Sequence, residues 1–95
     1  MEEDNKNVSL SEPQLALMRV LWSKPDSSVS DVVEAMRETR PLAHTTIATM
    51  LMRLEKRGLV TTTKAGRQLI YRATHSEAEI QRSMVSELLS SVFLG

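Results

Sequence analysis

The sequence contains no cysteine, which excludes disulfide bonds and thiolate metal sites from this chain. Aromatic residues make up only 3% of it, so it offers no aromatic platform on which single-stranded bases could stack. No apolar run approaches the length needed to cross a bilayer, and the acidic, polar start of the chain is unlike a signal peptide. We therefore expect a soluble, cytoplasmic protein with no membrane partner.

Groups that carry catalysis or hold cofactors are equally scarce. His44 and His75 are the only histidines; they lie far apart and have no carboxylate nearby at ligand spacing. No glycine-rich phosphate loop is present, and Asp31 and Glu34 are typical of the first turn of a helix. The sequence predicts no enzyme, no metal site and no cofactor.

The charges balance in number, with 12 basic and 12 acidic residues, but they are segregated along the chain. From Arg37 to Arg72 there are eight basic residues against two acidic ones, a net charge of +6. The remaining four basic and ten acidic residues give −6. Because the local field steers a polyanion, this segregation favours a nucleic-acid partner.

The stretch from residue 44 to 57 has the pattern of a helix with one apolar face. Ile47, Leu51 and Leu54 recur at helical spacing, and Gly58 offers a stop. The opposite face carries short side chains first and cations later, which suits a helix that enters the major groove of DNA. The alternative is an ordinary solvated face. Under the DNA hypothesis, the base-reading residues are Thr45, Thr46, Ala48, Thr49 and Met52, where Met52 either touches a thymine methyl group or lies exposed.

The segments around this helix predict a winged helix-turn-helix domain over residues 10–74, preceded by a flexible tail over residues 1–9. Ser11 is expected to cap a first helix with Trp22 in the core, and Ser30 is expected to cap a second. Two runs rich in β-branched residues, separated by a turn at Gly66, predict a hairpin, or wing. The fold class is thus mostly α with a small β-hairpin: a three-helix core plus wing.

The wing and the end of the helix at 44–57 share their charge, which predicts contacts to the DNA backbone. The predicted backbone contacts are His44 at the start of this helix, Arg53, Lys56 and Arg57 toward its end, and Lys64, Arg67, Gln68 and Arg72 on the wing. A basic hairpin tip on its own has an alternative explanation, which is that its charges keep the protein soluble.

Residues 75–95 predict a final helix, begun by a capping box at Ser76 and Glu79. Its apolar stripe widens toward the end of the chain, where the three-helix core and wing are already complete. Surplus apolar surface favours pairing with a second copy. The residues expected to pair are Met84, Val85, Leu88, Leu89, Val92 and Phe93. The alternative is packing back on the first helix.

Several of these segments together resemble the penicillinase repressor family, the BlaI/MecI/CopY type. The resemblance rests on Leu21-Trp22, the run 43–60, Gly66-Arg67 and Tyr71, and its most specific parts are 45–47 and 50–54. It implies a homodimeric winged-helix transcriptional repressor, whose helix at 44–57 reads an inverted-repeat operator with a TACA/TGTA-like core in double-stranded DNA.

The resemblance also implies features that this chain does not carry. Family members continue into further dimer helices, so we expect a truncated chain or a short member ending at Gly95. The segment cut by the family's sensor protease would then lie beyond that end. The copper-responsive branch uses C-terminal cysteines, and none is present here, so we expect no copper sensing through thiolates within residues 1–95.

Two other readings of the sequence stay open. A winged-helix module can bind protein without specific DNA binding, and its binding would not respond to DNA sequence. A winged-helix repressor of another family would change the operator but not the mechanism.

Overall fold

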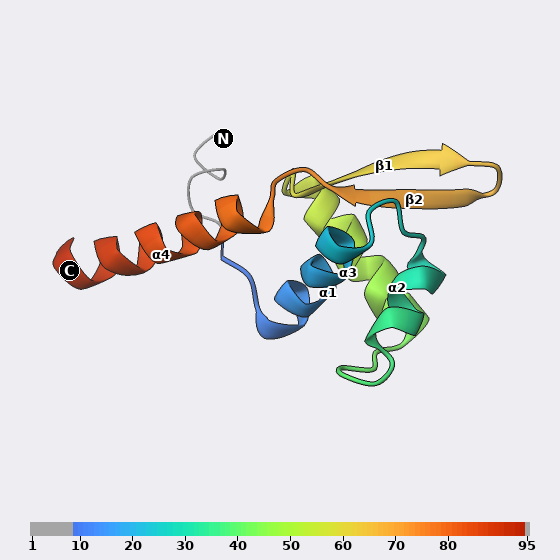
Figure 1. Ribbon diagram of the computed structural model, residues 1–95, viewed down its shortest axis with the longest axis horizontal. Helices are drawn as coiled ribbons and strands as arrows, with labels where there is room; N and C mark the ends of the chain where they lie inside the picture. Colours follow the sequence, from blue (N-terminus) through green and yellow to red (C-terminus); the bar gives the residue numbers. More distant parts are fainter. Residues whose placement is uncertain (1–8, 95) are drawn as a thin grey trace.

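The computed structural model describes residues 9–94 and confirms the predicted class, mostly helical with one small hairpin (Figure 1). In chain order the elements are α1 (Glu12–Ser23), α2 (Val29–Met36), α3 (His44–Lys56), β1 (Val60–Ala65), β2 (Gln68–Ala73) and α4 (Glu77–Leu94). The first three helices pack together, the hairpin projects past them, and α4 points away at the opposite end (Figure 1). Apart from Ser9, the predicted tail lies outside the described residues.

Serine capping boxes begin α1 and α4, as predicted. The Ser11 hydroxyl accepts from the Gln14 N–H at 3.2 Å, and the Gln14 side chain accepts from the Ser11 N–H at 2.9 Å. Ser76 and Glu79 repeat this exchange at 3.1 and 2.8 Å. Each box satisfies N–H groups that have no partner inside the helix.

The cap predicted for α2 is wrong by two residues. Ser28, not Ser30, is the N-cap: its hydroxyl accepts from the Asp31 N–H at 3.1 Å, and the Asp31 carboxylate accepts from the Ser28 N–H at 3.0 Å. A capping box begun at Ser30 would place Val33 at the third helical position. The valine side chain has no oxygen that could accept a hydrogen bond from the Ser30 N–H. Ser30 instead lies exposed inside the helix.

Gly58 ends α3, as predicted, in a left-handed conformation with φ of 79°. The Gly58 N–H donates to the Glu55 carbonyl at 2.9 Å, and the Leu59 N–H donates to the Leu54 carbonyl at 2.9 Å. This pair of bonds is a Schellman motif, and its accompanying apolar contact is available because Leu54 and Leu59 are both buried. The motif turns the chain from the helix directly into the wing.

The β-branched runs predict strands over residues 59–63 and 68–72 with a four-residue turn, whereas the observed strands, β1 and β2, each contain six residues and the turn is tighter. The two strands are antiparallel, with Val60 opposite Ala73 at the base and Ala65 opposite Gln68 at the tip. Only Gly66 and Arg67 connect them, and Gly66 takes a φ of 64°. Of these two residues only Gly66 has a positive φ, the pattern of a type II′ hairpin turn.

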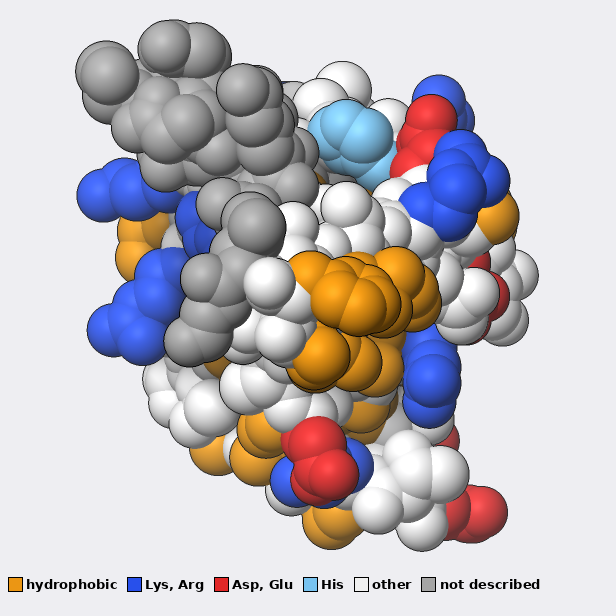
Figure 2. All heavy atoms as spheres, turned by 90° about the vertical axis from the view of Figure 1, so that its left-hand side faces the viewer, with side chains coloured by type: hydrophobic (Ala, Val, Ile, Leu, Met, Phe, Trp, Pro, Cys, Tyr) orange, Lys and Arg blue, Asp and Glu red, His pale blue; other side chains and the backbone are white. Residues whose placement is uncertain are grey.

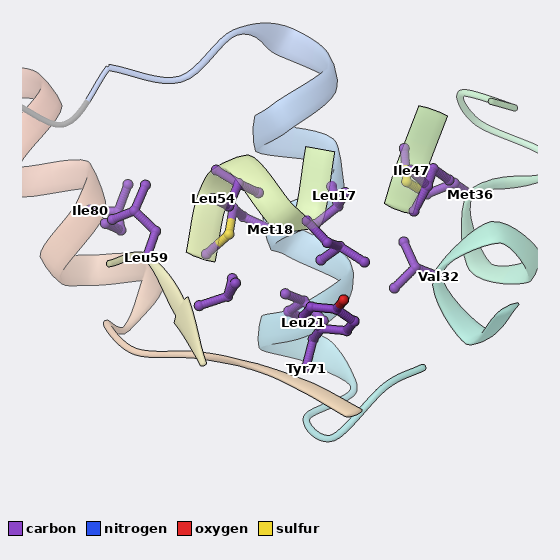
Figure 3. Close-up of a cluster of buried hydrophobic side chains, with 12 residues drawn as sticks. Leu17, Met18, Leu21, Val32, Met36, Ile47, Leu54, Leu59, Tyr71 and Ile80 are labelled. Carbon is purple, nitrogen blue, oxygen red and sulfur yellow. The ribbon is translucent and has the colours of Figure 1, made fainter. Parts of the chain in front are cut away.

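One core joins all of the elements (Figure 3). Leu17, Met18, Leu21, Val32, Met36, Ile47, Leu51, Leu54, Leu59, Val60, Tyr71 and Ile80 are its buried members. Trp22 is only partly buried at the edge, and its indole N–H donates to the His75 carbonyl at 2.8 Å. Since Ile80 belongs to α4, the core extends past the expected domain boundary at residue 74.

The loop before α2 is fastened to the wing. The Ser27 and Tyr71 backbones exchange two hydrogen bonds, at 3.1 and 2.8 Å. Next to them, Asp26 has a positive φ of 66°, which is uncommon for a residue other than glycine. Both oxygens of its carboxylate accept from the Arg72 guanidinium, at 2.8 and 2.7 Å, so the ion pair holds this strained residue against the hairpin.

These contacts predict how stability depends on pH. Hydrogen bonds from Arg72 lower the pKa of Asp26, and hydrogen bonds from Ser28 lower the pKa of Asp31, below the ordinary value of 3.8. Each carboxyl has a lower pKa in the folded protein than in the unfolded chain. The stabilisation is therefore fully present at pH values above the pKa of the unfolded chain, and it is lost as the pH falls through the pKa of the folded protein. In circular dichroism melts, we expect the Tm to drop below about pH 4.

The Asp26→Asn variant should have a lower Tm at neutral pH and a smaller drop in acid. Glu38→Gln is the matched control, since it removes an exposed carboxyl that forms no ion pair with the described residues. An Asp26→Asn protein whose Tm follows the wild-type curve at every pH would show that the ion pair does not stabilise the fold.

Candidate nucleic-acid interface

The two faces of α3 divide as predicted. Ile47, Leu51 and Leu54 are fully buried against α1 and α2. On the other side, Thr45 and Thr46 are exposed, and Ala48 and Thr49 are half-buried. Met52 follows them with half of its side chain exposed. The first two turns of α3 therefore present short side chains that let the helix approach a surface closely.

The N-terminus of α3 has no capping side chain. Its N-cap residue is Ala43, which makes no side-chain hydrogen bond to the first turn, in contrast to the serine boxes of α1 and α2. The hydroxyls of Thr45, Thr46 and Thr49 likewise make no hydrogen bond within the described part of the chain. The donors at this end stay available for an acceptor outside the protein, such as a phosphate or a base edge.

The basic side chains around α3 and the wing differ in whether they form ion pairs. Arg37 and Arg40 form ion pairs with Glu34 at 2.6 Å and Glu12 at 3.0 Å. Arg53, Lys56, Lys64 and Arg67, in contrast, form no ion pair with any residue in the described range 9–94. All four are exposed, two on the last turns of α3 and two near the tip of the wing.

The structure gives two of the predicted backbone contacts partners inside the protein. Arg57 is half-buried and donates to the Ser9 carbonyl at 3.0 Å. Arg72 is paired with Asp26, on the wing face opposite Tyr71, which points into the core. His44 and Gln68 are exposed at the start of α3 and at the tip of the wing.

The outer half of α4 leaves an apolar face uncovered. Val85, Leu88, Leu89, Val92 and Phe93 are between 50% and 78% exposed. Figure 2, viewed toward the free end of α4, shows hydrophobic side chains gathered near the middle of the side of the molecule that faces the viewer. Met84 differs from the others in the predicted set, because it is partly buried against the core. Packing against the core thus involves the first turns of α4 and stops before residue 85.

Sequence reasoning missed one exposed residue of the wing. Leu69, opposite Lys64, is 47% exposed and is not among the apolar residues that pack against the core. Strand alternation alone assigns it to the same face as the buried Tyr71. Only the structure shows that the hairpin has passed the edge of the core at this point.

Within 9–94, no three His, Asp or Glu side chains come together as they would to hold a metal ion. No helix of that part is long and apolar enough to span a bilayer.

Comparison with known proteins identifies the fold and the family. The penicillinase repressor family profile matches residues 10–95. The regulatory protein MecI of Mammaliicoccus sciuri is 25% identical over 92 residues, which are 97% of this chain and 75% of that protein. The regulator BlaI of Mycobacterium tuberculosis is 33% identical over 86 residues, 90% of this chain and 62% of that protein.

A solved structure agrees with these matches. The solution structure of monomeric BlaI from Bacillus licheniformis, in complex with the blaP half-operator, superposes with a TM-score of 0.64 at 29% identity, covering 76% of this chain and 88% of that one. The superposition confirms the winged-helix fold. With a match that spans residues 10–95, this chain belongs to the penicillinase repressor family.

Proposed function

We propose that this DNA-binding repressor acts as a homodimer on an inverted-repeat operator, with one α3 in the major groove of each half-site. The observation that supports this most is the set of unpaired groups on two adjacent elements. Threonine hydroxyls face outward on α3, and four cations without ion pairs follow on α3 and the wing. Thr45, Thr46 and Thr49 are assigned to base edges, and Arg53, Lys56, Lys64 and Arg67 to phosphates.

The related BlaI complex supports one winged domain per half-site, since that protein was solved as a monomer on a half-operator. For the second domain, we assign the apolar face of α4 to the dimer contact. Two domains related by a two-fold axis can place their recognition helices about one turn of DNA apart, roughly 34 Å. The bound dimer would block transcription in the cytoplasm by occupying the promoter. Repression of this kind requires no catalysis, and it ends when the dimer separates or its affinity for DNA falls.

The experiment that tests this proposal begins by sequencing the DNA that the purified protein selects from random fragments. We expect an inverted repeat. Thr49→Ala should then lose about 1–3 kcal/mol of binding free energy on the selected site, because a base contact is removed, and little on random DNA of the same length. Gel shifts at fixed salt measure both affinities.

Arg37→Ala is the control, since Arg37 is exposed, is paired with Glu34 and is not among the residues assigned to DNA. Equal losses for Thr49→Ala on both DNAs would move Thr49 from base reading to backbone contact. Selection that returns no shared sequence would instead support a winged-helix module that binds protein.

A further inference from the structure

Within the described range 9–94, the exposed large apolar side chains lie on only three parts of the fold, which are α3, the wing and α4. Five of these side chains form the α4 face. The other two, Met52 and Leu69, lie on the outer side of α3 and on the wing. Both elements of the proposed DNA interface therefore carry an uncovered apolar side chain beside their free cations.

We propose that Leu69 is a DNA contact, and that its side chain packs against the deoxyribose walls of the minor groove beside the half-site. This assignment rests on the proposed function and adds an apolar contact to a wing otherwise assigned to phosphates. Proteins that bind the minor groove frequently insert apolar side chains, leucine among them, into that groove.

The position of Leu69 follows from the register of the hairpin. Along the inner face of the wing, Val60 and Tyr71 are buried in the core, and Thr62, opposite Tyr71, is half-buried. The next pair outward on that face is Lys64 with Leu69, and both are exposed. Leu69 is thus the first inner-face residue of β2 beyond the edge of the core.

The charges around Leu69 favour DNA as the molecule that covers it. The hairpin from residue 60 to 73 contains three basic residues and no acidic one. Lys64 lies opposite Leu69, and Arg67 lies in the adjacent turn, and neither has an ion pair among the described residues. A leucine beside two such cations would lie next to the phosphates that they bind, where the sugar carbons of the groove offer an apolar surface.

The test compares two neighbouring residues given the same change. Leu69→Gln should weaken binding about tenfold per half-site, the value expected from covering the exposed half of one leucine, and therefore up to about 100-fold for a dimer on the selected operator. The slope of affinity against salt should stay at the wild-type value, because no cation is removed. Ile70→Gln, on the opposite face of the wing, should change affinity less than about twofold.

Hydroxyl-radical footprinting then measures directly which deoxyribose positions the protein protects from cleavage. Wild type should protect deoxyribose positions in the minor groove beside each half-site, and Leu69→Gln should lose that protection while keeping the protection under α3. Circular dichroism melts confirm that both variants are folded. A folded Leu69→Gln protein with wild-type affinity and footprint would overturn the Leu69 contact alone. A wild type that binds no DNA would overturn the proposed function and this contact with it.

Discussion

A Leu88→Asp protein is expected to fold normally, to sediment as a monomer, and to bind operator roughly 10² to 10⁴ times more weakly than wild type. Leu88 is 64% exposed on α4, so the aspartate costs the isolated domain little. At a paired α4 surface it would be a charge buried without a partner. Each large aliphatic side chain removed from water contributes about 1.5–3 kcal/mol, so a few of them can hold a dimer at micromolar concentration.

The expected loss of operator affinity in Leu88→Asp follows from thermodynamic linkage between dimer formation and DNA binding. When one domain is bound, the second binds its half-site at a high effective concentration, and a monomer loses that advantage. Ser90→Asp is the matched control, because it places the same charge at another exposed position of α4, on the opposite side from Leu88. Analytical ultracentrifugation determines whether each protein is a monomer or a dimer. If wild type, Leu88→Asp and Ser90→Asp sediment alike and bind operator alike, α4 does not join two protomers.

Raising the salt concentration from 50 to 200 mM is expected to weaken operator binding by roughly 10³ to 10⁵, the range for a protein that contacts about 6 to 10 phosphates. Two protomers that each present Arg53, Lys56, Lys64 and Arg67 supply enough cations for this range. Each phosphate contact releases condensed counterions, so affinity falls linearly on a log–log plot. Fluorescence anisotropy of a labelled operator across a salt series gives the slope.

Lys64→Ala or Arg67→Ala should weaken binding to all DNA sequences alike and reduce the slope by about 2, because a dimer loses two contacts. Arg37→Ala should leave the slope unchanged, since that side chain is paired with Glu34. A slope near zero for wild type would contradict an electrostatic footprint on α3 and the wing.

Periodicity and local capping carried most of the fold prediction. The apolar spacing of α3 was enough to predict its buried face, because Ile47, Leu51 and Leu54 lie on one side of any regular helix. The stop at Gly58 was equally local, since it depends on one residue that can adopt a positive φ. Ser28 and Ser30 show the limit of such rules: both serines suit a cap, and the partner three residues later decides between them.

Contacts between distant segments could not be predicted in the same way. Arg72 pairs with Asp26, which is 46 positions away in the sequence, and no local pattern indicates this ion pair. Ile80 enters the core because the chain turns back after the wing, and no periodicity in α4 indicates where that contact stops. The division of cations into paired and unpaired groups likewise emerges only from the folded arrangement.

The contact between Trp22 and the His75 carbonyl gives the protein a built-in optical probe. Trp22 is the single tryptophan of the chain, and its indole bridges the end of α1 and the short linker that leads into α4. Because an indole at the edge of a core responds to changes in its hydration, its fluorescence emission should report on how α4 is attached to the winged domain. Movement of α4 during pairing or DNA binding can therefore be followed without any added label.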